Sequence, residues 1–266
     1  MDDAEISHAR TCVFVYWADD VKLRDSCIHS FHDKGIHAVS VGEAGIVISG
    51  NTIERGVGLD EAYGNECIVL ENVDQCEVTG NWIDLGGVGP QTPTLDRNGI
   101  RIQNYQAFCQ STNPPEPRVQ SITGNRIKGP GASHEFDATG LLADWACGLG
   151  NRDVDISGNY FDGWSLRALW VKEALDVDAS CNAIVGNDVG VHFDRSKYNS
   201  GWPEVRFRGN RIRPAAGASS QSAGTRTTNA LAIDYGPSTS ATGLSSSRRR
   251  TASPSSSRTI RPPATR

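Results

Sequence analysis

Short apolar runs recur along most of the chain, and each run leads into a polar turn that contains asparagine. The unit reads apolar, any residue, apolar, then Ser or Thr, Gly, Asn, any residue, apolar. Asn tolerates the left-handed backbone of a tight turn, and stacked Asn side chains can hydrogen-bond from coil to coil. The central asparagines are 23 to 44 residues apart, and the shortest step gives a minimal coil within the solenoid range. The copies are residues 47–53, 78–83, 122–127, 156–161 and 207–212, with looser copies at 24–28 and 179–184.

A second apolar segment lies upstream of each asparagine unit and alternates with a period of two, which predicts one buried face. A single coil cannot bury its own apolar side chains, but stacked coils close a continuous core. The intervals lack amphipathic helical patterns, which disfavours the rival doubly wound α/β fold. The pattern therefore predicts an all-β parallel solenoid with eight coils. The eight segments are 12–16, 35–39, 67–71, 99–103, 140–144, 168–172, 190–194 and 230–234.

These repeats resemble those of the right-handed parallel β-helix proteins with GN-x-I coil units. That family includes polysaccharide lyases, uronan C5-epimerases, some glycoside hydrolases, and phage and cell-surface proteins. The resemblance covers residues 11–235 and implies a single-stranded right-handed parallel β-helix with a polysaccharide as partner, although a fold does not fix an activity. The Asp-Pro-His-Asp/Glu motif of the epimerases is absent: residues 140–144 match a strand that ends in a functional Asp, whereas residues 99–102 supply Arg101.

Composition divides the chain near residue 236. The formal charge is −5, and residues 237–266 carry six Arg and no acid, which leaves −11 on residues 1–236. Such an acidic body argues against a nucleic-acid partner and leaves room for a cation, with Ca²⁺ as the candidate cofactor. We expect residues 1–236 to form the β-helix, truncated at its N-terminus, and the Ser/Arg/Pro-rich residues 237–266 to be a disordered tail.

Signals for location and redox state are sparse. No apolar run reaches 18 residues, so no membrane span is expected. The first residues lack the basic-then-apolar order of a signal peptide, whereas the family resemblance implies a secreted or cell-surface protein. Seven Cys residues form no CxxC pair, and several lie within apolar segments, so buried thiols are expected. The oligomeric state is open.

Stacking in register would place the outward residues of the eight segments in two columns along one face. Strands lie ~4.8 Å apart, so the columns span roughly 34 Å, which is long enough for several sugar residues. The first column is Phe14, His37, Val69, Arg101, Leu142, Trp170, His192 and Ala232, and the second is Tyr16, Val39, Glu71, Gln103, Asp144, Lys172, Asp194 and Asp234.

The middle of this face carries residue types that uronate chemistry uses. Lyases and epimerases of the family neutralise a carboxylate, remove the C5 proton with a base and employ an acid. The resemblance implies Lys172 or His192 as the base and Arg101 as the group that neutralises the carboxylate. Asp144 completes the catalytic set as an acid. Substrate binding is assigned to Trp170, Gln103, Glu71 and Asp194, with Tyr16 as a further ring that could stack on a sugar.

Other interpretations stay open. Asp144, Lys172 and Asp194 would be neighbours on three successive strands, and such a charge ladder can stabilise a sheet by ~0.2–1 kcal/mol per pair. Glu71, Asp144 and Asp194 are acids that could hold Ca²⁺, although no residue is assigned as a metal ligand. Instead of an enzyme, the protein could be a non-catalytic glycan-binding or structural surface module. The aromatic residues Trp145, Trp164 and Trp202 are expected to line the groove or to cover coil ends and loops.

Overall fold

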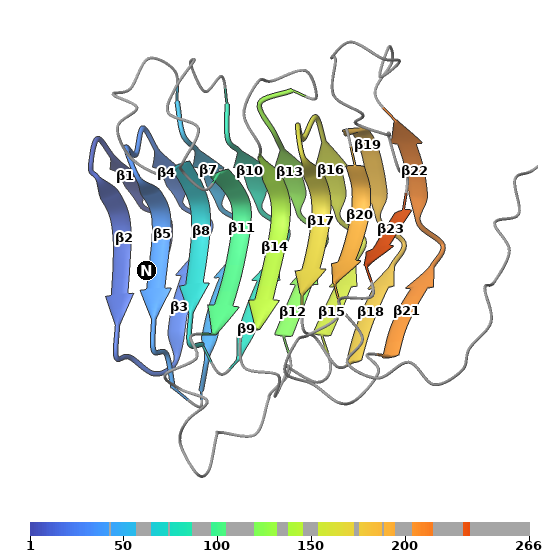
Figure 1. The fold of residues 1–266 in the computed structure, drawn as a ribbon. Coiled ribbons are helices and arrows are strands. Elements are labelled where there is room, and N and C mark those ends of the chain that lie inside the picture. The colour runs from blue at the N-terminus through green and yellow to red at the C-terminus, as the bar shows by residue number, and fades with distance from the viewer. Residues whose placement is uncertain are drawn as a thin grey trace, which may run out of the picture. The chain divides into compact units, whose positions relative to one another are not determined.

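The computed structural model contains only β-strands as regular elements in the part of the chain that it describes (Figure 1). No helix in that part is long and apolar enough to cross a membrane. The predicted tail, residues 237–266, lies outside the described residues, so its disorder stays a prediction. The described residues are 1–42, 44–56, 65–73, 75–86, 97–104, 120–131, 138–145, 154–172, 176–187, 189–194, 204–214 and 231–234.

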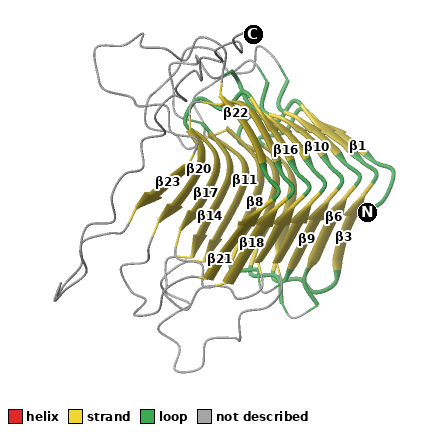
Figure 2. Cartoon of the chain, turned by 90° about the vertical axis from the view of Figure 1, so that its right-hand side faces the viewer, coloured by secondary structure: helices red, strands yellow, loops and turns green. Residues whose placement is uncertain are grey.

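The strands form three parallel sheets, and the chain visits the sheets in rotation, so that each strand pairs with the strand three places later. We call them sheet 1, sheet 2 and sheet 3 after their first strands. Figure 2 shows the three sheets surrounding a common interior. This arrangement confirms an all-β parallel fold and is compatible with a β-helix solenoid.

The bounds of the strands follow, sheet by sheet. Sheet 1 contains β1 (Glu5–Ser7), β4 (Cys27–His29), β7 (Thr52–Glu54), β10 (Trp82–Asp84), β13 (Arg126–Lys128), β16 (Tyr160–Asp162), β19 (Ala183–Asn187) and β22 (Arg211–Pro214). Sheet 2 contains β2 (Thr11–Tyr16), β5 (Lys34–Val39), β8 (Asn65–Glu71), β11 (Arg97–Asn104), β14 (Thr139–Trp145), β17 (Arg167–Lys172), β20 (Val189–Asp194) and β23 (Leu231–Asp234). Sheet 3 contains β3 (Val21–Arg24), β6 (Ile46–Ser49), β9 (Cys76–Thr79), β12 (Gln120–Thr123), β15 (Val154–Ser157), β18 (Asp176–Ser180) and β21 (Glu204–Arg208).

The inward positions of sheet 2 match the predicted register. Strand pairing places the predicted apolar residues opposite one another on successive strands. Their side chains are 0–3% exposed, so the period-two pattern correctly identifies the core face. These buried residues are Ile36, Ala38, Ile68, Leu70, Ile100, Ile102, Leu141, Ala143, Leu169, Val171 and Val191.

The asparagine units build a buried ladder at one corner of the solenoid. The side-chain amide of Asn81, for example, donates to Oδ1 of Asn125 at 2.9 Å and to the backbone oxygen of Ile48 at 2.8 Å. The preceding residue, Gly80, has φ +63°, which explains why glycine stands before the asparagine. The same bond between side chains links each Asn to the next, as expected from the repeat. The ladder runs through Asn51, Asn81, Asn125, Asn159, Asn182 and Asn210.

Trp164 is part of the interior and lines neither a groove nor a surface loop, contrary to expectation. Its side chain is 0% exposed, and Nε1 donates to the backbone oxygen of Ile127 at 3.2 Å. A Cβ atom on Gly99 or Gly129 would come within 3.1 Å of its ring, so these glycines make room for it. The side chains of Trp145 and Trp202 lie outside the described residues.

Candidate functional site

The outward columns of sheet 2 have the register that the sequence predicts. Arg101 pairs with Leu142, which pairs with Trp170, which in turn pairs with His192. The second column pairs successively as Glu71, Gln103, Asp144, Lys172 and Asp194. The backbones of Asp144 and Asp194 are therefore placed, whereas their side chains lie outside the described residues.

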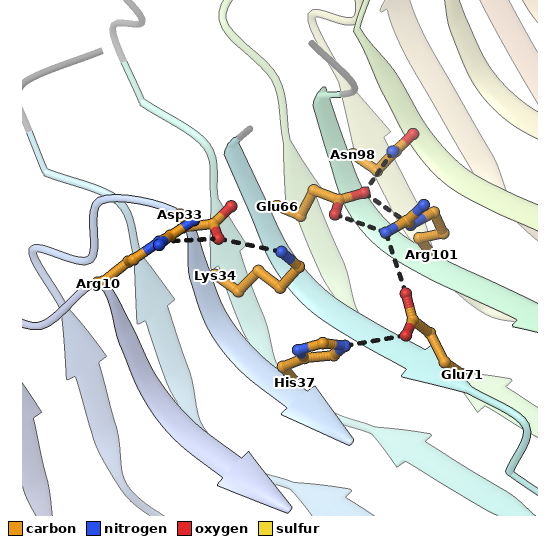
Figure 3. Close-up of polar contacts among 8 residues, drawn as sticks. All are labelled: Arg10, Asp33, Lys34, His37, Glu66, Glu71, Asn98 and Arg101. Carbon is orange, nitrogen blue, oxygen red and sulfur yellow. Dashed lines mark hydrogen bonds and ion pairs between the residues drawn. The ribbon is translucent and has the colours of Figure 1, made fainter. Parts of the chain in front are cut away.

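Arg101 is the centre of the first polar group on this face (Figure 3). Its Nε atom lies 2.8 Å from Oε1 of Glu66, and Nη2 donates to Oε2 of the same carboxylate at 3.0 Å. Nη2 also contacts Oε1 of Glu71 at 3.4 Å, and Nη1 donates to Oε1 of Gln103 at 2.9 Å. The guanidinium thus meets one carboxylate with two nitrogens and a second carboxylate with one, which fixes its orientation.

Glu66 is buried beneath this group. Its side chain is 4% exposed, and Asn98 Nδ2 donates to Oε1 at 2.8 Å. A carboxylate this deeply buried needs both a counter-charge and hydrogen bonds, and Arg101 and Asn98 supply them. Together with Glu71, Gln103 and His37, these residues form what we call the Arg101 cluster.

Glu71 connects the Arg101 cluster to the neighbouring strand β5. One carboxylate oxygen, Oε1, faces Arg101, and the other, Oε2, lies 3.1 Å from Nε2 of His37. The side chains of Glu71 and His37 are 11% and 18% exposed. The carboxylate is therefore shared between a permanent cation and an imidazole that can carry a proton.

A second group surrounds Trp170. The Cζ atom of Arg167 lies 3.7 Å from the ring centroid of Trp170, and Nζ of Lys172 lies 4.0 Å from it. The His192 ring is parallel to that of Trp170 within 4°, with centroids 5.8 Å apart. We call these four residues the Trp170 cluster, in which two cations contact one aromatic ring.

The protonation of His192 follows from its hydrogen bond. Arg167 Nε donates to Nδ1 of His192 at 2.7 Å. A guanidinium has no acceptor, so Nδ1 must be the unprotonated nitrogen, and in this arrangement Nε2 carries the proton of a neutral ring. In this tautomer His192 can donate a hydrogen bond through Nε2.

The predicted site residues therefore fall into two groups rather than one. Arg101, Gln103 and Glu71 belong to the Arg101 cluster, and Lys172, Trp170 and His192 belong to the Trp170 cluster, two strands or roughly 9.6 Å further along. The ring of Trp170 is already contacted by two cations, so a sugar stacking on it would compete with them. Among the described residues, no group of three or more His, Cys, Asp or Glu side chains could hold a metal ion.

Three participants were missed by the sequence analysis: Glu66, Asn98 and Arg167. They pair across sheet 2 in a third outward column, which also contains Lys34 and Thr139. In each strand, the residue of this third column stands three positions before the residue of the first column. Residues on one face of a regular strand are two positions apart, so a strict alternation does not identify this column. The sequence did contain a signal for this column: a polar residue stands two positions before the first of the two inward apolar residues in each of these strands.

Comparisons of the chain with protein-family models, with curated proteins and with solved structures find no match.

Proposed function

We propose that the outer face of sheet 2 binds and processes an acidic polysaccharide, as a lyase, epimerase or hydrolase. The observation that carries this proposal is the Trp170 cluster, where Arg167, Lys172 and His192 gather on one outward face. Arg and Lys recognise carboxylates, and they lie in columns roughly 34 Å long that would follow an extended chain. The same proposal includes the right-handed winding that the family resemblance implies and the eight coils that the repeated segments predict.

Roles for the residues follow from their contacts. Arg167 would bind the uronate carboxylate, as Arg101 would in the next subsite along the face. In a lyase reaction a base takes the C5 proton, the C4–O4 bond breaks, and the departing oxygen takes a proton from the carboxyl group of Asp144, while Nε2–H of His192 donates a hydrogen bond to that oxygen. Lys172 would be the base in this scheme.

A panel of acidic and neutral polysaccharides tests the proposal, with binding measured by calorimetry and products measured as unsaturated uronate and as new reducing ends. Lys172→Ala and His192→Ala should abolish turnover. Lys128→Ala on sheet 1 is the matched control, because Lys128 is an outward lysine of another face, paired with Asp84. If wild-type protein binds no acidic polysaccharide, or if Lys128→Ala is as damaging as Lys172→Ala, the proposal is wrong.

A non-catalytic glycan-binding module is the second candidate. It is favoured by the way charged groups on this face contact one another: Arg101 faces Glu66 and Glu71, which suits a rigid surface. This alternative predicts saturable binding in the same panel with neither unsaturated products nor new reducing ends. In that case Arg167→Ala would weaken the affinity for acidic polysaccharides, and neither the wild type nor the variant would form products.

A further inference from the structure

Three large aromatic side chains are exposed together at the β2 end of sheet 2. Phe14 and Tyr16 are each 60% exposed, and Trp17 is 74% exposed. Phe14 and Tyr16 point outward from β2 with their rings parallel within 8° and centroids 6.2 Å apart. Trp17 lies against Tyr16, with centroids 6.0 Å apart and an angle of 60° between the rings. We call this group the aromatic platform.

The rings of the platform are open, unlike that of Trp170. Among the described residues, no cation lies over Phe14, Tyr16 or Trp17, whereas Arg167 and Lys172 both contact Trp170. Within the same part of the chain, the Tyr16 hydroxyl and Trp17 Nε1 make no hydrogen bond, so both keep their full capacity for a ligand. Exposed apolar groups gathered in one place are typical of a binding surface.

Trp17 occupies a backbone position that does not suit it. Its φ is +51°, and the equivalent turn positions of the next two coils, Ser40 and Asn72, have φ +54° and +53°. The equivalence follows from the backbone hydrogen bonds, since each of these three residues donates its N–H to the next strand of sheet 2. A left-handed conformation is unfavourable for a bulky residue and easier for Asn. Folding alone thus does not explain a tryptophan here, and an exposed ring held at a cost indicates a functional use.

We propose that the aromatic platform is a subsite that stacks against the sugar rings of a polysaccharide. This proposal rests on the proposed function, because both place a polysaccharide on the outer face of sheet 2. The binding of a sugar by the aromatic platform, however, does not depend on charge. Flat aromatic faces contact the C–H face of a pyranose, while Tyr16 and Trp17 offer hydrogen bonds to its hydroxyls. The platform therefore binds the sugar ring itself, whether or not the sugar carries a carboxylate.

The platform adjoins the Arg101 cluster. The ring of His37 lies 5.3 Å from that of Phe14, and Nε2 of His37 contacts Glu71, which in turn contacts Arg101. A chain that stacks on the platform would therefore extend over His37 toward Arg101. Because the aromatic platform continues into the Arg101 cluster, we infer that a polysaccharide occupies it.

The variant Trp17→Asn tests the proposal without endangering the fold. Asn is the residue that the chain itself uses at the equivalent position 72, so the unfolding free energy should stay equal or rise. We expect about tenfold weaker binding of an uncharged β-1,4-glucan hexasaccharide and of an oligouronate hexasaccharide, measured by calorimetry. Phe14→Ala should weaken both similarly. Ser40→Asn, at the same turn one coil later, is the matched control and should bind like wild type.

The outcomes separate this proposal from the proposed function. If Trp17→Asn binds both hexasaccharides as wild type does, or if wild type binds neither, the platform is not a sugar subsite. A further outcome is that Arg167→Ala leaves the oligouronate affinity unchanged while Trp17→Asn still weakens binding of the uncharged hexasaccharide. That result would overturn the proposed specificity for acidic polysaccharides and would support the aromatic platform as a sugar subsite. A concentration-dependent dimer that Trp17→Asn dissociates, without any change in sugar binding, would show that the platform covers a second copy and would overturn the proposal.

Discussion

The asparagine ladder concentrates its hydrogen bonds in single side chains. Oδ1 of Asn125 accepts from the backbone and side-chain nitrogens of Asn81, while Nδ2 donates to Val78 and Asn159. Asn125→Ala would leave these buried groups unpaired, and each costs ~1–3 kcal/mol. We expect a loss of about 3 kcal/mol or more in unfolding free energy by urea denaturation. Thr123→Ala, a partly buried neighbour, should cost under about 1 kcal/mol, and equal losses would contradict the interpretation.

The buried thiols give stability a dependence on pH. Burial raises the pKa of Cys76 from 9.0 to about 12, and it raises the pKa of Cys67 in the same direction. Above pH 9 the unfolded chain loses thiol protons that the folded protein keeps, so unfolding becomes more favourable as pH rises toward 12.

From about pH 9 upward, Cys76 should therefore lower the unfolding free energy by about 1.4 kcal/mol per pH unit. Urea denaturation at about pH 8 and about pH 10 measures this change. In Cys76→Ala the decrease between the two pH values should be smaller than in wild type. Parallel pH dependence of the two proteins would exclude Cys76 as a cause.

At the scale of the elements, close packing between strands makes some glycines irreplaceable. A Cβ on Gly99 would lie 2.6 Å from the backbone oxygen of Gly140 and 2.7 Å from Ile127 Cγ2. Gly99→Ala should therefore cost roughly 2–3 kcal/mol, because strand β11 must shift against β14. In Gly80→Ala the Cβ meets nothing within 4 Å, and only its φ of +63° is unfavourable, at ~1–2 kcal/mol. Thermal unfolding of both variants measures the difference, and a smaller loss for Gly99→Ala would refute this packing argument.

The Arg101 cluster joins β8 and β11 through a buried ion pair. Removing Arg101 strands the carboxylate of Glu66, which is 4% exposed, so Arg101→Ala should cost about 3–5 kcal/mol. The double variant Glu66→Gln, Arg101→Met should lose much less unfolding free energy than the sum of the losses in Glu66→Gln and in Arg101→Met. In the double variant neither partner leaves the other's charge buried without its counter-charge. A double-mutant cycle by denaturation should give a coupling above about 1 kcal/mol, and additive losses would mean that the pair is not coupled.

The contents of the two clusters show where a sequence stops being informative. Alternation predicted that Arg101, Trp170 and His192 share an outward column, and strand pairing confirms it. It did not predict Glu66 or Arg167, because each is followed by two consecutive buried residues, Cys67–Ile68 and Ala168–Leu169, which breaks the alternation. Nor can spacing reveal that Arg167 lies over Trp170, since that contact depends on side-chain rotamers.

The fold of the whole molecule was more predictable than its site. Each coil repeats the same unit, so an error in one coil is corrected by the next, and the three sheets follow from stacking those units. The position of a single long side chain in the site is not repeated from coil to coil, so no other coil corrects an error in predicting it. Trp164 illustrates this limit: nothing in its local pattern indicated that glycines on neighbouring coils leave space for an indole in the core.

Stability in such a stack should be local, because each coil contacts only its neighbours. Ile28 on β4 and Ile127 on β13 are both 0% exposed in sheet 1, and they make a matched pair for testing this. Each change to Ala should remove about 2–5 kcal/mol of packing. Near the β1 end of the sheet, Ile28→Ala should loosen only the first coils, whereas Ile127→Ala should weaken the middle of the stack on both sides.

Hydrogen exchange measured by mass spectrometry distinguishes these responses. In Ile28→Ala, amides of β1 and β4 should exchange faster while those of β13 and β16 stay protected. In Ile127→Ala, exchange should rise in β10, β13 and β16 together, because β13 pairs with both of the other strands. If Ile28→Ala accelerates exchange in β16 as much as in β1, the stack unfolds as one unit, and the coils are coupled over a longer range than their contacts indicate.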